Sequence, residues 1–181
     1  MIFKKFSQWP TSKILKISLI IGFALCFGVI PVMQYFTQLS GFPAEIFSSQ
    51  LSFSGELMKS YYALTDIELY RIAPSLDYFF MVGYGLILFS SSLFIARRYR
   101  ASSMIQKGGF IIATSGVIAA CCDAIENIFI LLMLTDPLGF PDYWALTHSV
   151  FALIKWILLF IVIIWIAIFG ILSLLKKEKK I

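Results

Sequence analysis

Four long apolar blocks dominate this 181-residue chain and limit what it can fold into. They cover about residues 17–36, 74–96, 109–134 and 144–175. An α-helix needs about 20 apolar residues to cross the ~30 Å hydrocarbon core of a bilayer, and each block is near or above that length. With 60% hydrophobic and only 14% charged residues, the chain cannot build the polar exterior of a soluble domain. We therefore predict one all-α domain, a polytopic membrane four-helix bundle.

Charged residues alternate in sign between the segments that join these blocks. Three clusters are basic: Lys4, Lys5, Lys13 and Lys16; Arg97, Arg98, Arg100 and Lys107; Lys176, Lys177, Lys179 and Lys180. The segments between them, 37–73 and the turn after residue 134, are net acidic. Basic loops stay in the cytoplasm, so we expect both termini there, 37–73 outside, and an inner (plasma) membrane of bacterial type. The basic clusters then face anionic lipid of the bilayer, and nucleic acid is not an expected partner.

The external segment 37–73 is predicted to form two short surface helices. Apolar residues recur at helical spacing at Leu57, Tyr61 and Leu64. Thr65 and Glu68 have the spacing of a capping box, with Thr65 as the N-cap of the second helix. Pro74 should open the second span, because a missing N–H costs nothing in the first turn. Three aromatic side chains are expected at the level of the lipid headgroups: Tyr61, Tyr62 and Tyr70.

Several polar residues lie inside the predicted spans, and they fall at one depth. Counting inward from the outer ends at ~1.5 Å per residue places Tyr84, Asp123, Glu126 and Lys155 between about 13 and 18 Å down. An ionisable residue at mid-bilayer costs about 2.5 to 3.5 kcal/mol, so each one marks a candidate site. Two carboxyls face one lysine here, and a carboxyl without a partner should take up a proton. We expect Glu126 to be the neutral one.

Helical periodicity places the polar residues of three spans on inward faces. Gly116, Ala120, Asp123 and Asn127 fall within a narrow arc, whose small residues would let a neighbouring backbone approach closely. His148 and Lys155 share a face of the fourth span, as Asp77 and Tyr84 do on the second. Asp77, near the outer end and in the first turn, should gain from the helix dipole and reach water. The candidate ligand-binding cluster is Asp77, Tyr84, Asp123, Glu126, Asn127, His148 and Lys155.

The three cysteines suggest neither a metal site nor disulfide chemistry. Cys26, Cys121 and Cys122 all lie in apolar blocks, with no CxxC pair and no Cys/His group at ligand spacing. We expect no cofactor. The absent cysteine pairs also argue against the disulfide-exchanging four-helix enzymes, and the long segment 37–73 distinguishes the chain from small multidrug transporters. No motif specifies an oligomeric state.

Two short motifs nevertheless resemble a known family. Leu76, Asp77 and Phe80, followed by Tyr84, form an LDxxF…Y pattern, and residues 123–127 form a DxxEN pattern. Their order is similar to that of a family of small, uncharacterised bacterial four-helix integral membrane proteins, over about residues 53–156. The resemblance implies this topology and a polar layer inside the bundle, and it implies no activity.

Three functions are compatible with such a cluster. The protein could bind a lipid, a small amphipathic ligand or a proton at the Asp/Glu/Asn–Lys cluster. It could be a membrane-embedded enzyme that uses a protonated carboxyl as general acid on a lipid-like substrate. It could also be a structural or assembly subunit of a membrane complex, in which the polar residues only fix the pairing of the helices.

Overall fold

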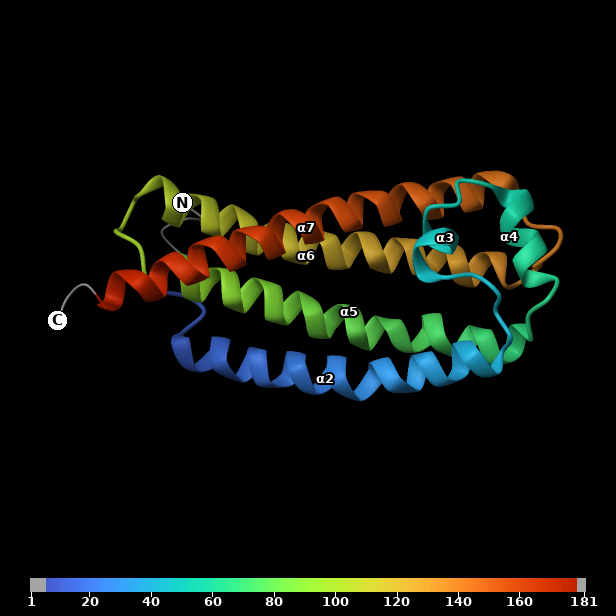
Figure 1. Ribbon diagram of the computed structural model, residues 1–181, viewed down its shortest axis with the longest axis horizontal. Coiled ribbons are helices and arrows are strands. Elements are labelled where there is room, and N and C mark those ends of the chain that lie inside the picture. The colour runs from blue at the N-terminus through green and yellow to red at the C-terminus, as the bar shows by residue number, and fades with distance from the viewer. Residues whose placement is uncertain (1–5, 179–181) are drawn as a thin grey trace.

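The computed structural model describes residues 6–178, with side chains described as far as residue 175. These residues form six helices and no strand (Figure 1). Four helices are long: α2 (Ser12–Leu39), α5 (Ile67–Ala96), α6 (Met104–Met133) and α7 (Asp142–Glu178). Each contains a stretch long and apolar enough to cross a membrane. The prediction of an all-helical fold with four helices that could span a membrane is therefore confirmed, while their insertion and direction across the membrane stay predictions.

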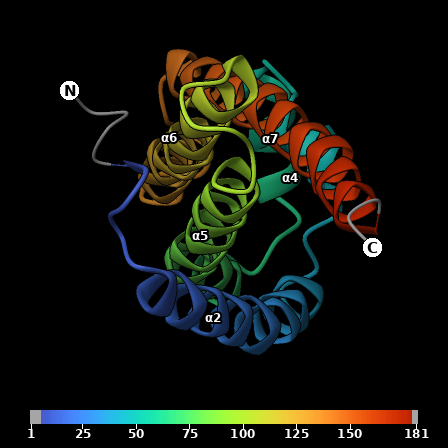
Figure 2. The same ribbon diagram turned by 90° about the vertical axis from the view of Figure 1, so that its left-hand side faces the viewer.

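The four long helices are arranged in the order α2, α5, α6 and α7 across the molecule. α5 lies in the middle, with α2 packed on one side and α6 on the other, and α7 packs mainly on α6 (Figures 1 and 2). The first helix therefore has one main neighbour, and its outer face exposes large apolar side chains such as Ile20 and Phe27. Such a face is suited to lipid, since lipid tails are as apolar as these side chains.

Small residues bring the central helices close together. A Cβ atom added at Gly22 of α2 would lie only 2.7 Å from the carbonyl oxygen of Gly83 on α5. A Cβ added at Gly116 of α6 would lie 2.9 Å from the Cβ of Leu88 on α5. The predicted close approach along the small-residue face of the third span is confirmed, whereas the contact at Gly22 was not predicted.

Helix bounds agree with the predicted spans within five residues, except at the start of the second. α5 begins at Ile67, and its N-cap is Asp66, which accepts a hydrogen bond from the Leu69 N–H at 3.1 Å. The prediction that Thr65 is the cap was wrong, because the Thr65 hydroxyl instead donates to the Tyr61 carbonyl at 2.7 Å. The prediction that Pro74 opens the helix was also wrong, since Pro74 lies inside it. Membrane helices tolerate such prolines when neighbouring groups satisfy the freed backbone.

Two short helices, α3 (Ile46–Gln50) and α4 (Gly55–Tyr62), lie between α2 and α5, and α4 covers one end of the bundle (Figure 1). A salt bridge of 2.7 Å from Lys59 to Asp142 joins α4 to the start of α7. Tyr62 and Tyr70 pack into a buried apolar group with Met133, so these two rings face the protein interior, while their predicted depth at the level of the headgroups stays a prediction. Burial, with Tyr70 close by, raises the pKa of the Tyr62 phenol well above its usual value.

The opposite end of the bundle, where α2 begins and α7 ends, is referred to below as the basic end. Its described basic side chains are Lys13, Lys16, Arg97, Arg98, Arg100 and Lys107. The remaining lysines of the terminal basic clusters lie outside the described side chains: Lys4, Lys5, Lys176, Lys177, Lys179 and Lys180.

Candidate functional site

The centre of the candidate site is a buried lysine held between two carboxyls. Lys155 Nζ of α7 lies 2.9 Å from Asp123 Oδ1 and 2.6 Å from Glu126 Oε2, both on α6. The two acids are three residues apart, so α6 presents them on adjacent turns of one face. Lys155 and Asp123 are each 3% exposed and Glu126 is fully buried. The ion pairs are therefore shielded from solvent, and each charge depends on its partners inside the protein.

Tyr84 of α5 completes the surroundings of Asp123. Its hydroxyl donates a hydrogen bond of 2.8 Å to Asp123 Oδ2, the oxygen that Lys155 does not contact. Both oxygens of Asp123 thus accept charge-assisted hydrogen bonds, which are the strong ones. This arrangement joins α5, α6 and α7 through one side chain.

His148 lies on the other side of Glu126 and is 1% exposed. Its Nδ1 is 3.9 Å from Glu126 Oε1, which is too long for a direct hydrogen bond and short enough for one bridging water. Neither ring nitrogen forms a hydrogen bond of good geometry with the described residues, and the backbones of Ser49 on α3 and of Glu126 lie beside the imidazole. Glu126 therefore lies between an ammonium group and an imidazole that has capacity for a further hydrogen bond.

Asp77 and Asn127 form the second part of the cluster. The Asn127 amide donates hydrogen bonds to Asp77 Oδ2 at 2.7 Å and to the Pro74 carbonyl at 3.2 Å. Asp77 is half-buried and interacts electrostatically with Asp123 and Lys155. Its predicted place in the first turn was wrong, since α5 begins ten residues earlier and the helix N-terminus is too far away to act on it.

All seven residues predicted from the sequence therefore come together from α5, α6 and α7. The cluster contains three carboxyls against one lysine, with the histidine in addition. Within the described residues, no three His, Cys, Asp or Glu side chains are grouped so that they could hold a metal ion. The three cysteines are free thiols.

The segment around α3 covers the cluster along α7, and sequence reasoning missed this contact. The Trp156 indole N–H donates to Gln50 Oε1 at 2.8 Å, and the Phe47 ring lies 4.6 Å from the Trp156 ring. The Phe53 N–H donates to Ser149 Oγ at 3.0 Å. The only indication in the sequence is that residues 48–54 are rich in serine, which is unusual beside apolar spans but does not say where the segment packs. We refer to residues 46–54 below as the α3 cover.

Comparison with protein-family models, curated proteins and solved structures finds no match to this chain. The resemblance to the bacterial four-helix family therefore stays a prediction, and the argument for function rests on the site itself.

Proposed function

We propose that this chain is a multi-pass inner-membrane protein, with both termini in the cytoplasm, that takes up and releases a proton at the buried cluster. The observation that carries the proposal is the charge count around Glu126. The cluster holds three carboxyls, Asp77, Asp123 and Glu126, and one ammonium group, that of Lys155, which contacts Asp123 and Glu126 and interacts electrostatically with Asp77. Uncompensated charge is costly inside a membrane, so a bound proton is the simplest way to balance the excess.

A proton fits the surroundings of the cluster better than a lipid or an amphipathic molecule does. Glu126 and His148 are almost fully buried, and the α3 cover packs along α7 beside them. Two cavities on the surface of the bundle are lined by other residues. A larger ligand would need an opening at this depth, whereas a proton needs only neighbouring donors and acceptors.

The contacts assign different roles to the two central carboxyls. Asp123 has both oxygens engaged by Lys155 and Tyr84, so we infer that its role is to hold Lys155 in place. Glu126 Oε1 faces the imidazole of His148 at 3.9 Å. We infer that the exchangeable proton is shared between Glu126 and His148. An imidazole has two ring nitrogens and can accept a proton at one while it donates a proton from the other, which suits a transfer step towards the α3 cover.

Infrared difference spectroscopy of the protein in lipid nanodiscs tests the proposal. Lowering the pH should produce a carboxylic acid band that the Glu126→Gln variant lacks. His148→Gln should shift the midpoint of that band, because it removes the neighbouring base. Asp136→Asn is the matched control, since Asp136 is an exposed carboxyl in the turn before α7. Wild-type spectra in which every carboxyl is ionised at about pH 6 would end the proposal.

The structural alternative has its own supporting observation, since the contacts of Asp123 join three helices. A cluster that only fixes helix pairing can be replaced by apolar residues of similar shape at little cost or with a gain. The triple variant Asp123→Leu, Glu126→Leu, Lys155→Met should then keep or raise its thermal stability, and the wild type should show no titrating carboxyl. An enzyme would additionally need an opening through which a substrate could reach Glu126.

A further inference from the structure

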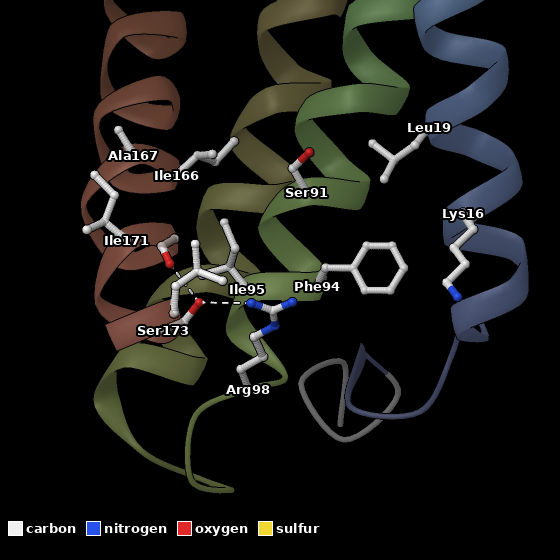
Figure 3. Close-up of a pocket in the computed structure, with 12 residues that line it drawn as sticks. Lys16, Leu19, Ser91, Phe94, Ile95, Arg98, Ile166, Ala167, Ile171 and Ser173 are labelled. Carbon is white, nitrogen blue, oxygen red and sulfur yellow. Dashed lines mark hydrogen bonds between the residues drawn. The ribbon is translucent and has the colours of Figure 1, made fainter. Parts of the chain in front are cut away.

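A groove runs between α2, α5 and α7 at the basic end of the bundle (Figure 3). Its volume is about 630 Å³. Most of its wall is apolar, with Leu19 from α2, Phe94 and Ile95 from α5, and Ile166 from α7. The groove exists because α2 packs mainly on α5 and α7 packs mainly on α6, so that α2 and α7 do not close against each other. It opens between membrane-spanning helices and is therefore accessible to lipid.

Two cations lie at the mouth of this groove, Lys16 of α2 and Arg98 just beyond α5 (Figure 3). Arg98 Nη1 donates to Ser173 Oγ on α7 at 3.2 Å, and no carboxylate pairs with Arg98 among the side chains of residues 6–175. The adjacent Arg97 is different, since it donates to the carbonyls of Phe6 and Pro10 at 2.9 and 2.7 Å. Arg98 therefore keeps its charge and several donors available at the groove.

The surroundings of the groove reinforce this positive charge. Every aspartate and glutamate with a described side chain lies between residues 45 and 142. These residues are found just before the α3 cover, in α4, in the central cluster or near the ends of α5 to α7 remote from the basic end. The described charged side chains at the basic end are all cationic. The groove thus combines an elongated apolar wall with an unneutralised positive mouth, which is complementary to an amphipathic anion.

We propose that this groove binds one anionic phospholipid. The phosphate group lies between Lys16 and Arg98, and an acyl chain lies along the wall formed by Leu19, Ile95 and Ile166. Arginine forms paired hydrogen bonds to phosphate, and basic pockets between membrane helices are sites for anionic headgroups. Inorganic phosphate would leave the apolar wall unused. The site is separate from Glu126 and His148, so the inference does not depend on proton binding.

Native mass spectrometry of the detergent-solubilised full chain tests the inference with phosphatidylglycerol as the probe and phosphatidylcholine as the neutral comparison. Wild-type protein should retain one phosphatidylglycerol in preference to phosphatidylcholine. Arg98→Gln should weaken that binding roughly fivefold, and Arg98→Gln with Lys16→Gln roughly 30-fold, since each cation near a phosphate contributes on the order of a fivefold factor. The matched control is Arg100→Gln, which removes an exposed cation at the same end that does not line the groove.

A second pair of variants tests the apolar wall without changing any charge. Ala167 lines the groove, and the next residue, Ile168, is exposed and does not. Ala167→Phe should fill part of the groove and weaken phosphatidylglycerol binding, whereas Ile168→Phe should leave it unchanged. Equal binding of the two lipids, an equal loss in Arg100→Gln, or complete displacement by inorganic phosphate would overturn the proposal. The proposal would also be overturned if the wild-type chain formed a dimer that Ala167→Phe disrupts, because a second copy of the chain would then occupy the groove. Helical content by circular dichroism confirms that each variant is folded.

Discussion

Replacing Lys155 by methionine removes the only ammonium group of the central cluster and keeps a side chain of similar length. In the wild-type protein this group lies 2.9 Å from Asp123 and 2.6 Å from Glu126, and all three side chains are at most 3% exposed. The variant therefore leaves two carboxyls in the same buried volume without a cation. Breaking a buried ion pair by removing one partner costs about 3 to 5 kcal/mol. We expect the free energy of unfolding at neutral pH to fall by that amount.

The pH dependence of the loss identifies its cause. The folded variant can relieve the uncompensated charge by protonating a carboxyl. A free carboxyl has a pKa of about 4, and keeping one protonated costs about 1.4 kcal/mol of free energy for each pH unit above that pKa. One proton therefore accounts for about 4 kcal/mol, in agreement with the range for a broken pair. Because the folded variant then binds a proton that the unfolded chain does not, its stability rises as the pH falls, by about 1.4 kcal/mol per unit. The deficit should be small near pH 4 to 5.

Reversible unfolding in mixed detergent micelles, followed by circular dichroism between about pH 7 and pH 5, measures this difference. Lys107→Met is the matched control, since Lys107 is an exposed lysine of α6 with no described salt bridge. Adding Asp123→Asn to Lys155→Met should restore part of the lost stability at neutral pH. The reasoning is refuted if Lys155→Met is as stable as the wild type at pH 7, or if its deficit does not change on acidification.

Two further predictions concern packing outside the cluster. Gly22→Ala should lower the free energy of unfolding by about 1 to 3 kcal/mol, because its Cβ would lie 2.7 Å from the Gly83 carbonyl oxygen. Gly28→Ala in the same helix has nothing within 4 Å of the added Cβ and should be neutral or up to about 1 kcal/mol more stable; equal effects of the two variants would contradict the close packing. Tyr62→Phe should raise the midpoint of thermal unfolding, because the buried Tyr62 hydroxyl forms no hydrogen bond with the described residues. A buried polar group without a hydrogen bond costs about 1 to 3 kcal/mol. A lower midpoint would contradict this reasoning.

The helices and the central cluster could be predicted because both follow from counting residues along each apolar span separately. Apolar length defined the spans, and a constant rise per residue placed Tyr84, Asp123 and Lys155 at one depth. The contacts of 2.8 and 2.9 Å among these three residues confirm that prediction. Buried charges also restrict each other, since Lys155 on α7 can be buried only where another helix provides a carboxylate.

The features that were missed depend on contacts between distant segments or on competition between adjacent residues. Thr65 and Asp66 are both good helix caps, and Asp66 is the cap because the Thr65 hydroxyl donates to the Tyr61 carbonyl in α4 instead. The polar run 48–54 has no periodicity that would place it beside Trp156, so the α3 cover could not be inferred from local pattern. Tyr62 and Tyr70 fit a membrane interface by type, and their burial follows from the packing of α4 over the end of the bundle.

The two proposed sites are separated along the same central helix. Tyr84 reaches the cluster and Arg98 reaches the groove, and the 14 residues between them correspond to about 21 Å of helix. A phospholipid phosphate at Arg98 is therefore well beyond contact with Asp123. The phosphate would lie at the aqueous end of the bundle, where salt screens charges over a Debye length of about 8 Å. α5 is fixed against α2 at Gly22 and against α6 at Gly116, so a bound lipid cannot slide it easily past its neighbours. Loss of lipid binding in Arg98→Gln should consequently leave the carboxyl titration at Glu126 unchanged, and each proposal can fail without the other.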